Sequence, residues 1–278
     1  MNNKKLIGSL MLLFAAMLWG GSYGMQSILS NSFGTYAIIF IKTVSGFLLL
    51  GLCALQKKKF DKTVILSGIL VGVVNGFGLI LQQIGIENTT VSKASFLSGL
   101  YVMFVPIIGL FTKKKPKKKY WLAIGVAFVG LYLLCMSGDE KLGYGDIITL
   151  CAAIFFALQI VLIDKYVSLV DPLLFCGFQQ STVAVISGIM MLLFEAPDFS
   201  NATSMIGPML YVSLLSGLLG QALQNKYQAY VDPTVASLIM SLESVFGTLG
   251  GWLLLNQTLT TNEIIGCVLL FVSIIIAE

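Results

Sequence analysis

Long runs of apolar residues, separated by short polar connections, recur along the whole chain. Each run holds roughly 20 residues, enough at 1.5 Å per residue for an α-helix to cross a hydrocarbon core about 30 Å thick. Membrane-spanning strands would need alternating segments of about 10 residues, which are absent from the sequence. The pattern predicts an all-α integral membrane protein with ten transmembrane helices, at residues 6–28, 35–55, 63–86, 91–112, 120–136, 144–164, 172–194, 206–227, 234–255 and 261–277.

The first apolar run resembles a signal peptide because it follows Lys4 and Lys5. It is longer than the roughly 7–15 apolar residues of a signal peptide and lacks a convincing cleavage site with small residues. We therefore predict a helix that is retained. Since little sequence remains between the spans for a soluble domain, we expect the protein to act within the lipid bilayer.

Composition supports this class of protein and excludes some chemistry. Of 278 residues, 57% are hydrophobic and 11% are charged, far from the balance of a soluble domain. The chain contains no histidine, which excludes metal binding through imidazole, and its five cysteines show no C-x-x-C spacing. We therefore expect no metal and no cofactor.

All 17 positively charged residues are lysine, and the ten-span topology puts 14 of them on one face of the membrane. The positive-inside rule then places both termini in the cytoplasm, with the protein in the plasma or inner membrane. The segment KKKPKKK at 113–119 could also bind a nucleic acid. Topology explains the same lysines, so we expect no nucleic-acid partner.

The sequence contains a weak internal repeat. LQQIGIENTTVSKASFLSGLYV (81–102) aligns without a gap with LQNKYQAYVDPTVASLIMSLES (223–244), at an offset of 142 residues. The repeat predicts a five-helix unit at 1–140 and a second one at 141–278. Because five crossings are an odd number, the second unit must be inverted, as in many secondary transporters whose substrate site lies near the midplane between the halves.

Polar residues inside the spans are candidates for function, because a charge at the helix centre costs about 2.5–3.5 kcal/mol on insertion scales. The candidate substrate-binding residues are Trp19, Ser22, Tyr23, Lys42, Asn75, Tyr101, Gln159, Gln180, Gln221 and Glu243. Buried amides and hydroxyls also link helices by hydrogen bonds, at about 0.6 kcal/mol each. That alternative stays open for the neutral residues, and plain packing stays open for Trp19.

Glu243 and Lys42 are the charged residues of this set. Glu243 is the repeat partner of Tyr101, and both are expected close to the bilayer centre. Two roles are open for Glu243: it could pair with a cationic substrate group or with Lys42, or it could take up H+ and couple transport to a proton gradient. Lys42 could attract a substrate carboxylate, so a zwitterion such as an amino acid would use both charges.

Two pairs of amides are candidates for gates. Gln82 and Gln83 lie toward the outer end of the third span, and their repeat partners Gln224 and Asn225 lie toward the inner end of the eighth. These positions would form opposed polar collars on the two sides of a central site.

Several segments resemble the EamA-type members of the drug/metabolite transporter superfamily. They are LLFAAMLWGGSYG, LQQIGIENTTVSKASFLSGLYVMFVPIIG and the closing SLESVFGTLGGWLLLNQTLTTNEIIGCVLLFVSIIIA. The resemblance implies an inverted-repeat transporter, often an exporter of amino acids or other small metabolites, with a central cavity. The family commonly shows Glu-Pro in the ninth span; here it is Glu243-Ser244, which leaves a kink at this point in question.

Three classes of function compete. The inverted repeat favours a secondary transporter that works by alternating access, as a monomer or a homodimer. An intramembrane enzyme would need a nucleophile with a base, or a metal cluster; with no histidine and no G-x-S-x-G motif, we expect no enzyme. A passive channel, or a receptor or scaffold that does not transport, is the remaining alternative.

Overall fold

A computed structural model of the chain describes residues 3–56, 58–111, 116–135, 142–196, 199–200, 202–255 and 260–277. Lysines 57, 113–115 and 141, used above for the topology, lie outside these residues. The first half contains α1 (Asn3–Leu29), α2 (Thr35–Thr43), α3 (Ser45–Leu55), α4 (Lys62–Asn88), α5 (Val91–Gly99), α6 (Tyr101–Gly109) and α7 (Lys118–Cys135). The second half contains α8 (Tyr144–Tyr166), α9 (Pro172–Phe194), α10 (Ile206–Leu210), η1 (Tyr211–Gly220), α11 (Gln221–Tyr227), η2 (Gln228–Tyr230), α12 (Pro233–Met240), α13 (Glu243–Leu255) and α14 (Thr261–Ala277).

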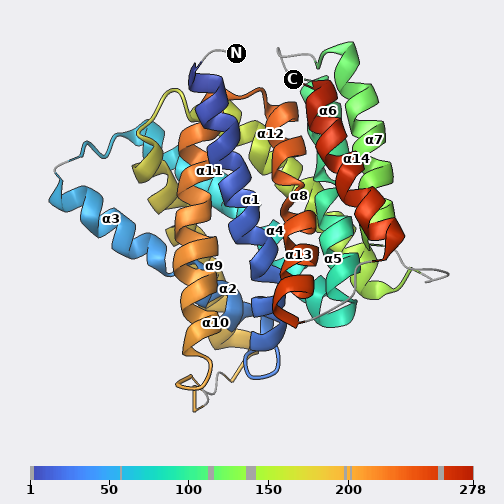
Figure 1. Cartoon of the computed structure of the whole chain (residues 1–278). Helices are drawn as coiled ribbons and strands as arrows, with labels where there is room; N and C mark the ends of the chain where they lie inside the picture. Colours follow the sequence, from blue (N-terminus) through green and yellow to red (C-terminus); the bar gives the residue numbers. More distant parts are fainter. Residues whose placement is uncertain are drawn as a thin grey trace.

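The all-α prediction is confirmed, since the described residues form helices and no strand. Among the residues that the structure describes, seven helical segments are long and apolar enough to cross a membrane: 3–29, 35–55, 62–88, 91–109, 144–166, 172–194 and 206–230. The other three predicted spans coincide with α7, with α12 and α13, and with α14, which pack into the same bundle (Figure 1).

Several helices begin at a residue whose side chain caps the helix N-terminus, close to a predicted span boundary. Asp61 accepts a hydrogen bond from the backbone N–H of Val64 (2.9 Å), at the start of α4. Asp171 and Asp232 cap α9 and α12 in the same way, and each precedes a proline that cannot donate a backbone hydrogen bond. Such caps satisfy N–H groups that lack an intrahelical partner, so the helices begin at these residues.

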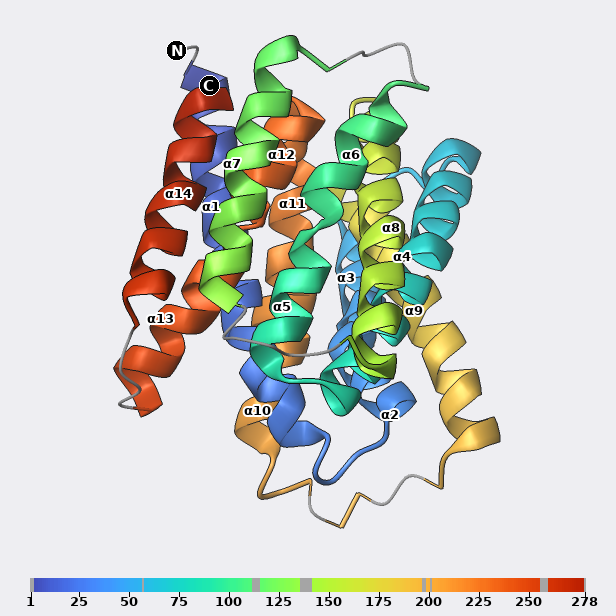
Figure 2. The ribbon, with the colours of Figure 1, turned by 90° about the vertical axis from the view of Figure 1, so that its right-hand side faces the viewer.

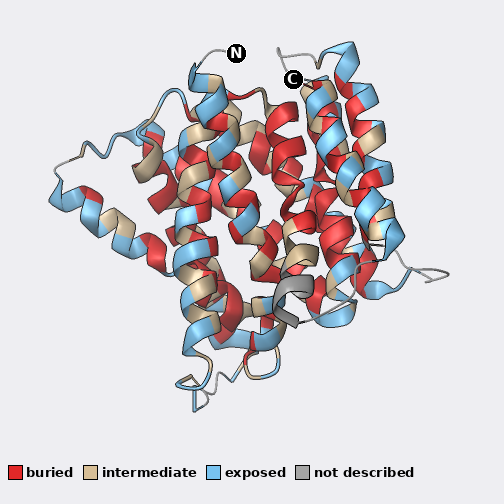
Figure 3. Ribbon diagram, in the orientation of Figure 1, coloured by how far each residue is buried: buried red, intermediate tan, exposed pale blue. Residues whose placement is uncertain are grey.

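The two halves of the chain interleave around one core. α1 packs against α13 and η1, whereas α4 packs against α8 and α9 (Figure 2). Buried residues face the inside of the bundle, and exposed ones lie on its outer surface (Figure 3). Many exposed residues are large and apolar, such as Leu192 and Ile275, which are 74% exposed each. This arrangement suits a protein whose outer surface contacts lipid.

Two helical segments are interrupted at equivalent points of the repeat. α5 and α6 are separated by Leu100, and α12 and α13 by Ser241 and Leu242, which lies 142 residues after Leu100. The second interruption occurs without proline, so the missing Glu-Pro does not abolish the break. The Ser241 hydroxyl donates to the carbonyl oxygen of Leu238 (2.8 Å), a local bond that competes with the helical ladder. Tyr101 and Glu243 are the first residues after the two interruptions.

Candidate functional site

A cavity with an empty volume of about 610 Å³, counting its open part, lies where helices of both halves meet. Its walls come from α1, α2, α4, α6, α8, α9, η1, α11, α12 and α13. The lining residues are Trp19, Ser22, Tyr23, Gln26, Lys42, Asn75, Leu79, Gln82, Tyr101, Phe156, Gln159, Ile160, Gln180, Ser216, Gly217, Gln221, Gln224, Met240 and Glu243.

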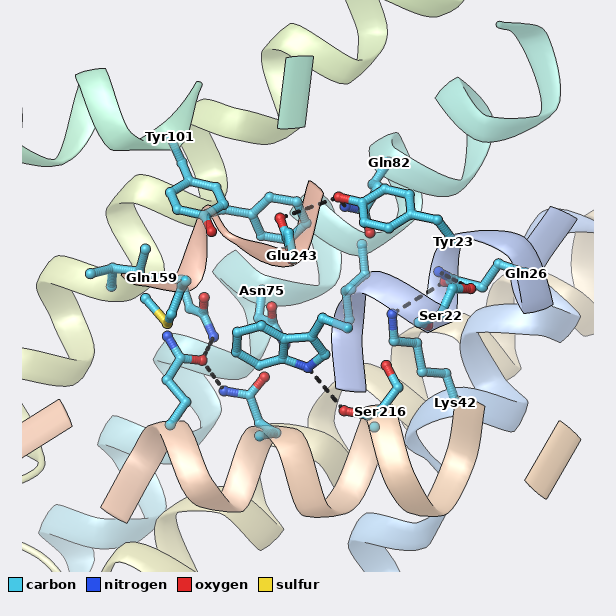
Figure 4. A pocket seen from close by; sticks show the side chains of 18 of the residues that line it. Ser22, Tyr23, Gln26, Lys42, Asn75, Gln82, Tyr101, Gln159, Ser216 and Glu243 are labelled. Atoms are coloured by element: carbon cyan, nitrogen blue, oxygen red, sulfur yellow. Dashed lines mark hydrogen bonds between the residues drawn. The ribbon is translucent and has the colours of Figure 1, made fainter. Parts of the chain in front are cut away.

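All ten candidate substrate-binding residues line this one cavity, although they come from eight different helices. Figure 4 shows these side chains around a common space, with labels on Ser22, Tyr23, Lys42, Asn75 and Tyr101 of the first half and on Gln159 and Glu243 of the second. The structure places these residues around one cavity, and their contact with a substrate stays a prediction.

Glu243 lies at the start of α13 and is 6% exposed. One of its carboxylate oxygens accepts a hydrogen bond from the Tyr23 hydroxyl (3.3 Å). The Tyr23 hydroxyl in turn accepts from Gln82 Nε2 (2.9 Å), which also contacts Ser98 Oγ (3.2 Å). Neutral partners on α1 and α4 therefore hold the acid at the cavity wall.

Lys42 lies near the end of α2 and is also 6% exposed. Its ammonium group donates to Gln26 Oε1 (3.2 Å), and Gln26 Nε2 donates to the carbonyl oxygen of Ser22 (3.2 Å). In the described part of the chain, Lys42 and Glu243 form no ion pair within 4.0 Å with each other or with another residue. The cavity thus contains an acid and a base that do not neutralise each other directly.

Close backbone contacts set the positions of both charged residues. A Cβ atom on Gly20 of α1 would lie 2.5 Å from the carbonyl oxygen of Glu243, so only glycine lets α1 approach α13 this closely. A Cβ atom on Gly217 of η1 would clash with the carbonyl oxygen of Lys42. Gly20 therefore allows close packing of α1 against α13 at Glu243, and Gly217 allows close packing of η1 against α2 at Lys42.

One wall of the cavity is a chain of amides. Gln224 Oε1 accepts from Gln221 Nε2 (2.7 Å) and from Gln159 Nε2 (3.4 Å). Gln224 Nε2 donates to Gln228 Oε1 (3.1 Å), and Gln228 Nε2 donates to the carbonyl oxygen of Ile160 (2.7 Å). These bonds connect the cavity to Gln228 at the start of the η2 turn without a charged group.

The four candidate gate residues divide into two kinds. Gln82 and Gln224 line the cavity, whereas Gln83 and Asn225 do not. Adjacent residues of a helix point about 100° apart, so the second member of each pair turns away from the space that the first one faces. The gating role of all four stays a prediction.

The two residues that turn away form bonds between helices. Gln83 Nε2 donates to Ser30 Oγ (2.9 Å) and to Glu87 Oε1 (2.9 Å). Asn225 Nδ2 donates to Gln179 Oε1 (2.8 Å). The bond to Ser30 joins α4 to the turn after α1, and the bond to Gln179 joins α11 to α9, whereas the bond to Glu87 lies within α4.

The sequence did not single out the η1 wall as a site. Residues Tyr211–Gly220 form a π-helix, a rare form often found at functional positions. Its carbonyl groups accept side-chain donors: Trp19 Nε1 bonds to Ser216 O (3.0 Å) and Gln180 Nε2 bonds to Gly217 O (2.7 Å). The spacing of Gly217, Gln221 and Gln224 predicts a shared face on the eighth span, but it gives no signal for Ser216. The apolar lining residues Leu79, Ile160 and Met240 carry no signal that separates them from core residues.

Outside the membrane, Lys58 and Asp171 connect the α3–α4 turn to the start of α9, with Nζ–Oδ2 at 2.8 Å. Partial burial raises the pKa of Asp171, but hydrogen bonds from Lys58 and from the backbone of Leu174 and Leu173 outweigh that effect. They hold the pKa of Asp171 below its usual value. The contact is remote from the cavity and serves the fold.

Comparisons with known proteins agree with this geometry. The model of the EamA-like transporter family matches twice, at residues 6–136 and 143–277. An uncharacterized transporter of Archaeoglobus fulgidus is 29% identical over 276 residues, which cover 99% of this chain and 87% of that protein. One solved crystal structure superposes with a TM-score of 0.81 over 98% of this chain and 96% of its own; at 13% identity it shows the fold alone. The chain therefore belongs to the EamA-like transporter family of the drug/metabolite transporter superfamily, and is a multi-pass membrane transporter of a small molecule.

Proposed function

We propose that the protein is a secondary transporter that exports a small zwitterionic metabolite, such as an amino acid, by alternating access. The observation that carries this proposal is the pair of buried, oppositely charged residues at one cavity, Glu243 and Lys42, without an ion pair between them. A buried charge is costly unless it is paired. A zwitterion would supply an ammonium group for Glu243 and a carboxylate for Lys42.

The remaining walls fit the body of such a substrate. Trp19, Phe156 and Leu79 offer apolar surface, while Asn75 and Gln159 offer amides that can bind either donors or acceptors. Few well-placed polar groups within an apolar lining are typical of small-molecule sites.

The architecture in this proposal is ten transmembrane helices in two inverted repeats, residues 1–140 and 141–278. Two observations support it: the family model matches each half separately, and the helix interruptions at Leu100 and Leu242 keep the 142-residue offset. With the cavity between the halves, rocking of one half against the other would expose it to each side of the membrane in turn. Gln82 and Gln83 would then close the outer side, and Gln224 and Asn225 the inner side.

The orientation in this proposal places both termini in the cytoplasm of a plasma or inner membrane. The start of α1, the start of α7 and the end of α14 lie at one end of the bundle (Figures 1 and 2). Lys4, Lys5, Lys118 and Lys119 belong to these starts, whereas Lys93 lies at the start of α5, at the other end. The lysine distribution thus favours a cytoplasmic position for the first end.

Solute counterflow in reconstituted vesicles tests the proposal. Vesicles loaded with an unlabelled L-amino acid are diluted into medium with the same labelled compound at trace concentration, for each of the proteinogenic amino acids. A carrier accumulates label transiently against its gradient for at least one of them. A channel gives only downhill flux and a scaffold gives none, and either result contradicts the proposal.

A further inference from the structure

Polar atoms without a hydrogen-bond partner gather at the cavity. In the described part of the chain, buried side-chain atoms without a partner include Ser22 Oγ, Asn75 Nδ2, Gln180 Oε1 and Ser216 Oγ, all on residues that line it. Buried polar groups in native proteins are nearly always satisfied, so unpaired ones need a reason. Their concentration around one space indicates groups that bind a ligand.

Two of these groups are hydroxyls close to Lys42. Ser22 is 1% exposed and Ser216 is fully buried. Ser22 is joined to Lys42 through Gln26, which bonds to the Ser22 carbonyl and to the Lys42 ammonium group. Ser216 precedes Gly217, whose Cα lies against the Lys42 backbone. Figure 4 shows Ser22, Ser216 and the ammonium group of Lys42 in one corner of the pocket.

This corner offers hydrogen-bond donors in excess. The Lys42 ammonium group has three donor hydrogens, and Gln26 Oε1 accepts one of them. Each serine hydroxyl adds one donor that is not used by the protein. The nearby indole N–H of Trp19 is already bonded to the carbonyl oxygen of Ser216, which fixes the η1 backbone there.

We propose that Ser22 and Ser216 act with Lys42 as a carboxylate subsite, which binds the anionic end of the substrate. A carboxylate accepts up to about four hydrogen bonds, and those with charged partners are the strongest. The two hydroxyls come from α1 and η1, so binding would tie an element of each half to the same anion. The inference rests on the proposed function, which places the substrate carboxylate at Lys42, and adds the two hydroxyl groups that bind this carboxylate.

Alanine variants of the two serines test the subsite, with Ser181→Ala as the matched control. Ser181 of α9 also has a buried hydroxyl oxygen without a partner, but it does not line the cavity. Removing an unpaired buried hydroxyl relieves a desolvation cost, so all three variants should keep or raise the melting temperature of the purified protein without ligand. A fall in melting temperature would show instead that the hydroxyl stabilises the fold.

Binding is measured by the ligand-dependent shift in melting temperature, from which apparent affinities are compared. The probes are the proteinogenic L-amino acids, their decarboxylated amines, and propionate and lactate as carboxylates without an amino group. Ser22→Ala and Ser216→Ala should each weaken amino-acid binding about tenfold or more. They should leave binding of the amines unchanged, and Ser181→Ala should bind all probes as the wild type does.

The outcomes separate the two proposals. If no amino acid binds the wild type but propionate or lactate binds in a way that depends on both serines, the subsite stands and the zwitterion proposal fails. If amino acids bind the wild type and both serine variants equally well, the subsite is wrong and the proposed function stands. If the variants weaken the binding of amines and of amino acids equally, the serines shape the cavity and do not bind the carboxylate.

Discussion

Glu243 is the residue whose replacement separates substrate binding from proton coupling. Glu243→Gln keeps the shape and the bond from Tyr23 but cannot pair with an ammonium group, so counterflow of the substrate should fall about tenfold or more. The melting temperature should hold or rise, because a buried charge is removed. Glu263→Gln, at the start of α14 and away from the cavity, is the control. Intact counterflow combined with lost uptake under a pH gradient would assign Glu243 to proton coupling instead.

The ion pair between Lys58 and Asp171 should make the stability of the protein depend on pH in the acid range. Asp171 has a lowered pKa, so its contact with Lys58 stabilises the fold above the usual carboxyl pKa of about 3.9, and this contribution is lost as the pH falls below it. Asp171→Asn keeps a helix cap but removes the ion pair. We expect about 0.2–1 kcal/mol lower stability at pH 7 and a smaller loss between pH 5 and 3 than in the wild type, by thermal unfolding in detergent. Equal acid sensitivity of both proteins would rule out this contribution.

The ten cavity residues could be predicted because polar side chains in a membrane span are costly and therefore few. The argument is strongest for Lys42 and Glu243, because a buried charge is costly in a residue that only packs, and both residues line the cavity. It could not reach Ser216, because a serine in a helix can bond to its own backbone and so signals little. Gln83 was grouped with Gln82 because a polar pattern does not resolve 100° of rotation on one helix.

At the scale of elements, the η1 π-helix positions the wall that meets Lys42, and Gly217 is the residue that lets it approach. Gly217→Ala would place a methyl group against the Lys42 carbonyl oxygen and within 2.8 Å of Val212 O. We expect a loss of about 1–3 kcal/mol in stability and a weaker apparent affinity for the substrate, measured by thermal unfolding with and without it. Gly24→Ala on α1, where a Cβ meets nothing within 4 Å, should be neutral or stabilising. If both variants behave alike, the close approach of η1 to α2 is not what matters.

The break between α12 and α13 could not be predicted from the sequence. The apolar run 234–255 predicts one continuous helix, and Ser244 in place of proline gives no reason to interrupt it. In the structure the Ser237, Ser241 and Ser244 hydroxyls all bond locally or across to α5, which leaves the helical ladder weakened at Ser241 and Leu242. Side-chain competition of this kind depends on packing, and a hydropathy pattern does not contain it.

At the scale of the whole molecule, the repeat could be recognised but the interleaving of its halves could not. The cavity needs Lys42 and Asn75 from the first half and Gln180 and Glu243 from the second, because α1 crosses to α13 and α4 lies between α8 and α9. Such contacts join residues far apart in the sequence, and low identity between the repeats leaves no pattern from which to derive them. The shared cavity is nevertheless what a two-half transporter requires, since a site within one half would not be exposed by motion between halves.

The proposed inverted arrangement predicts a difference in accessibility between equivalent loops. Lys59, between α3 and α4, and Ser200, between α9 and α10, occupy the same place in their repeats. The α3–α4 and α9–α10 connections that contain them lie toward opposite ends of the bundle (Figure 1). With the five native cysteines replaced, Ser200→Cys should react with a membrane-impermeant maleimide on intact cells, and Lys59→Cys only after permeabilisation. Each variant serves as the control for the other, because both positions are exposed. Labelling of both from one side would mean that the repeats run parallel, and a cavity between them would then lose the symmetry by which rocking opens it alternately to the two sides of the membrane.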